Sequence, residues 1–314
     1  MSTVLEARTG SPVRASRPRP RGGVRRETFA QWLFLAPAIV YVVVFFGYPV
    51  VKNLVMSFQE YTTKTFFTGE APWVGLANYV EVVQSTFFGI TVGNTLMFTL
   101  GSIVGQFVIG LLFALFFRKR FPLSGMLRSL LLLPWLLPVI ASTSVWKWIL
   151  DQDGGVLNQA LGLVGIGPVP WLTSPDVALI AVVLVNVWLG IPFNVALLYG
   201  GLQNIPDELY EAGALDGATG WKAFWHITWP SLRPVVTVTL VLGVIYTLKV
   251  LDIILGLTGG GPANSTQTLA TDSYFRSFRE FDFGAGAAVS NILILFSLVF
   301  AVIYLRVNRK QVDE

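Results

Sequence analysis

The stretch NIPDELYEAGALDGATGWKAFWHITWPSLRP, residues 204–234, decides the fold, because it is a polar segment set between two strongly apolar runs. Such a segment is expected in water beside a membrane rather than within it. Pro206 suits the first turn of a helix, since that turn leaves its N–H groups unpaired, and the acids Asp207 and Glu208 suit the positive end of the helix dipole. The pattern predicts a helix that ends near Asp216.

The second half of this segment predicts a turn and another short helix. Gly217 tolerates the positive φ of a helix C-terminus, and Thr219 is expected to cap the next helix. We expect Pro230 to stop that helix, one face of which is aromatic and carries Trp221, Phe224 and Trp225. Small side chains let another protein approach the backbone closely, so the segment is predicted to be a docking surface; they are Ala212, Gly213, Ala214, Gly217 and Ala218.

Composition places the chain in a membrane. Of its 314 residues, 54% are hydrophobic and 13% are charged, which is too apolar for a soluble domain of this size. The absence of cysteine excludes disulfides, thiolate metal sites and a cysteine nucleophile, and the single histidine, His226, excludes a histidine-clustered metal site. His226 is interpreted as a surface residue. The net charge of +4 is explained better by the basic residues that flank membrane spans than by binding to nucleic acid, so no nucleic-acid partner is expected.

The apolar runs predict a six-span domain at residues 29–310, with spans at 29–51, 90–117, 127–150, 177–199, 235–257 and 284–305. Residues 1–28 are rich in arginine and are interpreted as a disordered basic tail. The first span is expected to be a retained anchor, because it is too long for a signal peptide. Bases cluster at the ends that this topology places inside, so both termini are predicted to be cytoplasmic.

Prolines and glycines predict local features of these spans. Pro134 and Pro138 predict a kinked third helix. Gly101 and Gly105 have the spacing that lets two membrane helices approach closely, which favours packing over a functional role.

Polar residues within the spans are candidates for a solute path. Lys249 and Asp252 are expected to share one helical face with Tyr246, where they could line the path. An internal ion pair, or snorkelling toward the outer interface, is about equally compatible with the sequence. Asn186 and Asn194 form a similar stripe with Gly190, and their amides could contact the solute or, as is more common, hold helices together.

The spacing of residues 211–230 resembles the EAA loop of ABC importer permeases. Two positions depart from the usual pattern, because Gly213 replaces an alanine and Trp229 replaces a leucine. An ordinary cytoplasmic loop would account for the polarity but not for the full spacing. The resemblance implies that an ATPase couples to Glu211, Ala212, Gly213, Asp216, Gly217, Ile227 and Pro230.

Two further stretches narrow the resemblance to carbohydrate importers. LTGGGPANSTQT at 257–268 and WVGLANY at 73–79 are similar to stretches of the first permease of maltose- or glycerol-3-phosphate-type pairs. A flexible outer turn remains an alternative for the glycines at 259–261. The resemblance implies an all-α integral membrane protein with six transmembrane helices, the type I ABC importer permease fold and cytoplasmic coupling helices. It also implies a bacterial or archaeal cytoplasmic (inner) membrane.

The same resemblance implies partners. They are a second homologous permease, two cytoplasmic ATPase subunits, an extracytoplasmic solute-binding protein and membrane lipid. The chain has no G-x-x-x-x-G-K-[ST] stretch, so it lacks this phosphate-binding loop, and ATP and Mg are expected on the partner subunits rather than on this chain. The predicted function is inward transport of a sugar or related polyol by alternating access. There are two competing hypotheses, a carrier or channel that works alone and a membrane enzyme. The enzyme hypothesis lacks support, because the sequence shows no set of residues that could serve as a nucleophile, its base and the group that orients the base.

Overall fold

The computed structural model describes residues 23–119 and 121–312, and the chain divides into two compact units, of which the second begins at Asn53. Most of the predicted tail at residues 1–28 lies outside the described residues. Helix α1 (Gly23–Val42) nevertheless begins before the predicted start of the first span. The π-helical turn η1 (Val43–Gly47) and α2 (Tyr48–Met56) continue it. The apolar helix at Trp32–Met56 has no buried residue in its most apolar window.

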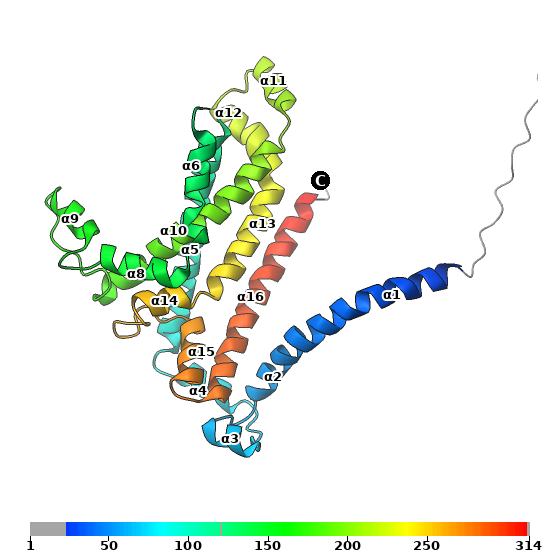
Figure 1. Ribbon diagram of the computed structural model, residues 1–314, viewed down its shortest axis with the longest axis vertical. Coiled ribbons are helices and arrows are strands. Elements are labelled where there is room, and N and C mark those ends of the chain that lie inside the picture. Colours follow the sequence, from blue (N-terminus) through cyan, green and yellow to red (C-terminus); the bar gives the residue numbers. More distant parts are fainter. Residues whose placement is uncertain (1–22, 120, 313–314) are drawn as a thin grey trace, which may run out of the picture. The chain divides into compact units, whose positions relative to one another are not determined.

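The described part of the second unit is built from helices. They are α3 (Thr63–Thr68), α4 (Ala77–Gln84), α5 (Phe88–Arg118), α6 (Ser124–Leu131), α7 (Leu133–Leu136), α8 (Val139–Ile149), α9 (Val156–Gly162), α10 (Pro175–Gln203), α11 (Asp207–Leu215), α12 (Trp221–Ala223), the π-helical turn η2 (Phe224–Thr228), α13 (Trp229–Leu248), α14 (Asp252–Leu257), α15 (Leu269–Phe278) and α16 (Phe283–Val312). Within this unit, α11 and α12 lie at one end and α3, α4 and α15 lie at the other (Figure 1).

Five helices among the described residues are long and apolar enough to cross a membrane, and a sixth crossing is possible only as a bent pair. This pair, residues 124–136 and 139–149, is bent by 99°. The predicted kink in the third span is therefore a break. Leu137 adopts an extended conformation because it precedes Pro138, and a residue before proline is disfavoured in the helical region.

The fifth span differs from its prediction at both ends. A helix runs through residues 221–248, so Pro230 does not stop it and the span ends before residue 257. In η2 the N–H of Trp229 donates to the carbonyl oxygen of Phe224, as in a π-helix. This wider turn leaves room for the ring of Pro230, which would otherwise meet the preceding turn of a regular α-helix.

Helices α5 and α10 form the centre of the unit. A β-carbon at Gly105 would lie 2.7 Å from Val187 Cγ2, and one at Gly101 would lie 3.3 Å from Val183 Cγ1. Such close approach favours small residues, so the predicted packing role of these two residues is confirmed. A core cluster of Phe98, Val182, Val185 and Ile254 continues this contact toward α14.

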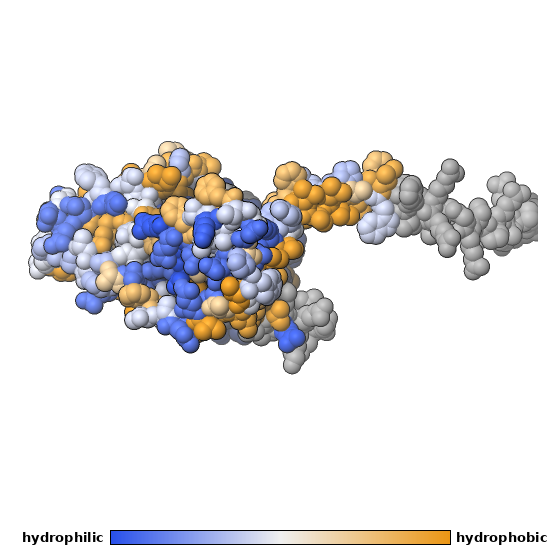
Figure 2. Space-filling model, turned by 90° about the horizontal axis from the view of Figure 1, so that it is seen from below, coloured by the Kyte–Doolittle hydropathy of each residue, from blue (hydrophilic) through white to orange (hydrophobic). Residues whose placement is uncertain are grey.

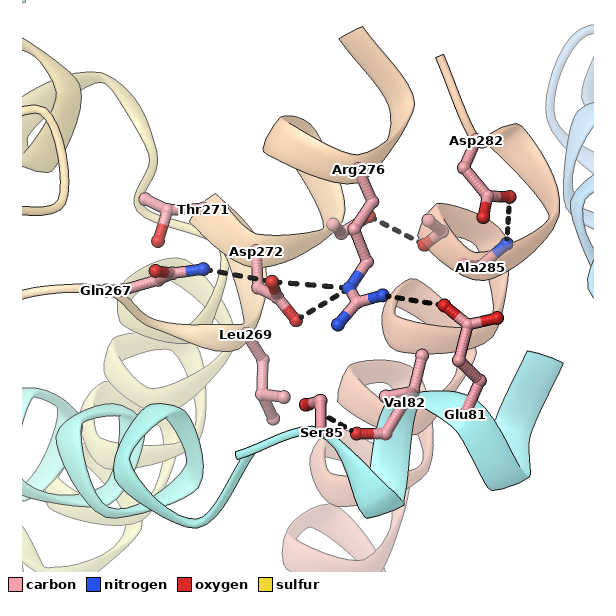
Figure 3. Close-up of polar contacts among 12 residues, drawn as sticks. Glu81, Val82, Ser85, Gln267, Leu269, Thr271, Asp272, Arg276, Asp282 and Ala285 are labelled. Carbon is pink, nitrogen blue, oxygen red and sulfur yellow. Dashed lines mark hydrogen bonds and ion pairs between the residues drawn. The ribbon is translucent and has the colours of Figure 1, made fainter. Parts of the chain in front are cut away.

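The end opposite α11 holds a partly buried polar cluster that joins α15 to α4 (Figure 3). Arg276 Nε lies 3.3 Å from Asp272 Oδ2, and its Nη1 lies 3.7 Å from Glu81 Oε1. Gln267 Nε2 donates to Asp272 Oδ1 at 2.9 Å. Figure 2, which looks at this end, shows hydrophilic residues gathered over it. The cluster therefore fixes α15 beneath a polar face.

Candidate functional site

The segment 204–234 begins with a short helix that ends as its sequence predicts. Gly217 has φ +77°, in the left-handed region. The N–H of Ala218 donates to the carbonyl oxygen of Gly213 at 2.7 Å, and the N–H of Gly217 donates to that of Ala214 at 3.1 Å. These two bonds form a Schellman motif, which satisfies carbonyl groups that the helix end would leave unpaired. The chain therefore turns sharply after α11.

The start of the second helix differs from the prediction. Gly220, rather than Thr219, is the residue before α12, and its φ of 55° with ψ of −117° lies in a region that strongly favours glycine. The backbone conformation thus selects Gly220, whereas the sequence pattern pointed to the hydroxyl of Thr219.

Gly213 and Ile227 join the two halves of the segment. A β-carbon at Gly213 would lie 2.5 Å from Ile227 Cδ1, so α11 and η2 are in close contact at this point. Alanine, which is usual at this position of the EAA pattern, would require the end of the Ile227 side chain to shift. Tyr210 and Thr228 form a second link, because their hydroxyl oxygens lie 2.9 Å apart in a hydrogen bond.

The outer face of α11 is exposed. Glu211, Ala212 and Asp216 are exposed, as is Pro230 in α13. Sequence reasoning missed Leu215, whose side chain is 91% exposed beside them. Leu209 of the same helix is also exposed, so α11 presents two large apolar side chains among its acidic ones. These side chains form the free face of the segment.

The opposite side of the segment is packed where two long helices, α10 and α13, meet. Its core cluster contains Leu202 of α10 and Leu232 of α13, together with Ile205. A β-carbon at Gly201 would lie 2.9 Å from Leu232 Cδ1, so α10 and α13 are in close contact here. Displacing the segment would therefore displace both helices, because packed cores transmit strain.

A cavity of about 440 Å³ lies farther along the same two helices. Trp135, Phe193 and Tyr246 supply aromatic walls, and Gln106, Asn186, Thr247 and Asp252 supply polar groups. Asn186 is 5% exposed, and its Nδ2 has no hydrogen-bond partner among the described residues. A buried donor without a partner costs free energy, so an amide at the cavity wall is a strong candidate to bind a ligand.

Lys249 and Asp252 do not share a helical face. Helix α13 ends at Leu248, Lys249 is the capping residue, and Asp252 begins α14, so the i, i+3 relation expected from the sequence does not apply. Asp252 lines the cavity and its Oδ1 accepts the N–H of Ile253 at 3.1 Å. Lys249 is not among the lining residues, and its Nζ lies 4.9 Å from the centroid of the Tyr246 ring. The described residues include no ion pair between the two.

Asn186 and Asn194 have different surroundings despite their shared stripe. Asn194 is buried, donates from Nδ2 to the carbonyl oxygen of Gly190 at 3.0 Å, and does not line the cavity. Its β-carbon faces Gly110, where an added β-carbon would lie 2.6 Å away. Asn194 therefore packs α10 against α5.

Gln106 is a cavity residue that sequence reasoning missed. Its Nε2 donates to the carbonyl oxygen of Asn186 at 3.0 Å, and its side chain occupies the space beside Gly190. A single glutamine within a long apolar span was the signal that could have found it, since polar groups at membrane depth are costly. Within residues 23–119 and 121–312, no cluster of His, Cys, Asp or Glu could hold a metal ion.

Comparison with known proteins identifies the family. Residues 106–313 match the model of the binding-protein-dependent transport system inner membrane component. The trehalose/maltose transport system permease protein MalF of Thermococcus litoralis is 37% identical over 92% of this chain and 96% of its own length. The diacetylchitobiose uptake system permease protein DasB of Streptomyces coelicolor is 33% identical over 94% of this chain and 92% of its own length.

A solved structure shares the fold. A bacterial ABC transporter involved in the import of the acidic polysaccharide alginate has a chain that superposes with a TM-score of 0.79 at 22% identity, covering 92% of this chain and 99% of that one. The fold is thus that of an ABC importer permease, with its helices in the inner membrane. The chain belongs to the family of binding-protein-dependent transport system inner membrane components, and it is a membrane-embedded subunit for inward solute transport.

Proposed function

We propose that the chain carries a sugar or related polyol through the 440 Å³ cavity, by alternating access that ATPase subunits drive from the segment 204–234. One observation carries this proposal. Helices α10 and α13 both line the cavity, and the segment joins them at their other ends, where Leu202 of α10 and Leu232 of α13 lie in one core cluster. A force applied to the exposed face of α11 therefore reaches the cavity through two rigid helices.

The lining of the cavity supports a saccharide as the solute. Aromatic rings offer apolar faces for the C–H groups of a sugar ring, and the Asn186 amide and Asp252 carboxylate can bond its hydroxyl groups. The volume falls within the range of roughly 300–1,000 Å³ that is common for ligand pockets. Trehalose, maltose and diacetylchitobiose appear in the names of relatives that are at least 33% identical, which favours the same class.

The proposed partners follow from exposed surfaces and from the family. The exposed apolar helix at Trp32–Met56 suits a second homologous permease, and the free face of α11 suits one of two cytoplasmic ATPase subunits, which bind ATP and Mg. The family is binding-protein-dependent, so an extracytoplasmic solute-binding protein is the third partner. In this orientation both termini are cytoplasmic and the polar face over α15 receives the solute-binding protein.

Reconstitution tests this proposal. The complete complex is placed in vesicles with its solute-binding protein outside and ATP inside, and uptake of labelled sugars is measured. We expect uptake that requires both ATP and the binding protein. Uptake by the isolated chain, driven by an ion gradient alone, would refute the proposal in favour of a carrier that works without ATPase partners.

A matched pair of variants tests the cavity. Asn186→Leu keeps the volume but removes the unpaired amide, and we expect about tenfold slower uptake, the loss of roughly one hydrogen bond to the solute. Ser297→Ala in α16 is the control, because Ser297 Oγ donates only to Leu293 of its own helix. Equal uptake by both variants would contradict the assignment of the cavity as the solute path.

A further inference from the structure

A second hollow lies between α5 and α12, apart from the solute cavity, and has a volume of about 640 Å³. Leu111, Leu112 and Leu115 form one wall, and Trp221 and Phe224 form another. Leu112 is 61% exposed and Trp221 is 72% exposed, so the hollow is open at the surface. We call it the α5–α12 groove.

One end of this groove is cationic. Arg118 and Lys119 are charged, and no carboxylate occurs among the described residues that line it. The Arg118 guanidinium lies 3.9 Å above the centroid of the Tyr210 ring, and its Nη2 lies 3.9 Å from Asp207 Oδ1. That ion pair is weak, because the Asp207 side chain is 87% exposed. Lys119 is exposed and its side chain has no partner in the described part of the chain.

The position of the groove along α5 relates it to the bilayer. Its leucines belong to the last turns of the apolar span at residues 88–118, where exposed side chains meet hydrocarbon. The two cations follow at the end of the same span, at the depth of lipid headgroups. Trp221 is also suited to this depth, since its ring is amphipathic. An occupant must therefore be apolar along the leucines and anionic beyond them.

We propose that the α5–α12 groove binds one anionic phospholipid. Its acyl chain lies between the leucine wall and the rings of Trp221 and Phe224, and its phosphate and anionic headgroup meet Lys119 and Arg118. A zwitterionic lipid matches the apolar wall, but its headgroup has no net charge to pair with the two cations. A soluble anion matches the cations, but it leaves the apolar wall unfilled.

Such a lipid would bridge α5 to the segment 204–234. Tyr210 of α11 and the first residues of α12 line the groove, so an occupant contacts the segment beside the joint of Gly213 and Ile227. The lipid would hold the segment against α5 while ATPases act on its other face. This effect on coupling rests on the proposed function, whereas the binding itself does not.

Native mass spectrometry of the purified complex tests the binding. Dioleoyl phosphatidylglycerol, dioleoyl phosphatidylcholine and inorganic phosphate are added separately, and occupancy per complex is measured. We expect saturable binding of phosphatidylglycerol that exceeds that of phosphatidylcholine, and no competition from inorganic phosphate. Lys119→Gln should weaken phosphatidylglycerol binding about fivefold. Lys222→Gln is the control, because Lys222 is an exposed cation nearby that does not line the groove.

Two further measurements keep the result decisive. Leu112→Trp should reduce lipid occupancy with both cations intact, because it fills the apolar wall. A photo-crosslinking residue at position 112 should give products with phospholipid in native membranes. Any one of four results would overturn the proposal. They are equal binding of the two lipids, equal effects of Lys119→Gln and Lys222→Gln, competition by inorganic phosphate, and crosslinks to polypeptide alone. If the complex binds phosphatidylglycerol as expected but does not transport sugar, the result would contradict only the proposed function and not the lipid site.

Discussion

Replacing Gly217 with valine should uncouple ATP hydrolysis from transport. The φ of +77° at Gly217 is strained for any residue with a β-carbon, and a β-branched side chain resists it most. Apart from the two chain neighbours, no described residue has an atom within 4 Å of a β-carbon built at this position, so the substitution causes strain without overlap. The damage should stay confined to the turn after α11.

The structure limits the size of this effect. A strained residue in the left-handed region costs about 1 to 3 kcal/mol. Relaxing the strain would break the Schellman bonds from Ala218 and Gly217, at 2.7 Å and 3.1 Å, and would turn α11 away from Ile227. This free energy is too small to unfold the membrane helices, but it shifts a docking equilibrium by about fivefold to a hundredfold.

The assay measures sugar uptake and ATP hydrolysis by the same vesicles. Gly217→Val should insert and assemble normally, yet should either dock its ATPases weakly or hydrolyse ATP with little uptake. Gly217→Asn is the matched control, since asparagine adopts the left-handed conformation more easily than valine does. A Gly217→Val complex with normal uptake per ATP would refute the role of the segment as the coupling element.

Three other predictions test different parts of the chain. Gly190→Val should lower thermal stability by about 1 to 3 kcal/mol and slow uptake, because a β-carbon there would overlap the side-chain amide of Gln106; unchanged melting and uptake would contradict this packing. Arg276→Met should destabilise by roughly 3 kcal/mol, measured by thermal melting, because Asp272 is buried, and adding Asp272→Asn should recover much of the loss. Deleting residues 1–21 should leave uptake unchanged at equal membrane abundance, since this stretch is too polar to bury a core.

Local chemistry explains which parts of the site the sequence could predict. The turn at Gly217 was predictable because a helix followed by glycine specifies its own hydrogen bonds within a few residues. The close packing of Gly101 and Gly105 was also predictable, since their spacing alone favours contact with a neighbouring helix. Both features depend on residues that are close together in the sequence, and the structure confirms both.

The break after Leu248 could not be predicted in the same way. No glycine or proline stands in residues 249–252, and the apolar run continues to residue 257, so the sequence reads as one helix. Tertiary packing overrides this preference, because Ile253, Ile254 and Leu257 of α14 are buried in the cluster around Phe98 and Val182. The Gln106 contact with α10 was hidden for a related reason, since its partner lies on a distant helix.

The break has a consequence for how the cavity could open. Asp252 stands at the start of α14, just beyond the end of α13, and α14 is anchored to α8, where a β-carbon at Gly256 would lie 2.6 Å from Thr143 Oγ1. Tyr246 and Thr247, by contrast, belong to α13, which begins within the segment 204–234 and whose Leu232 is buried in the core cluster with Leu202 and Ile205. Residues 249–251 are therefore the point where a displaced α13 can separate from a fixed α14. A movement that begins at Gly213 and Ile227 would then change the distance from Tyr246 to Asp252, and with it the width of the cavity between them.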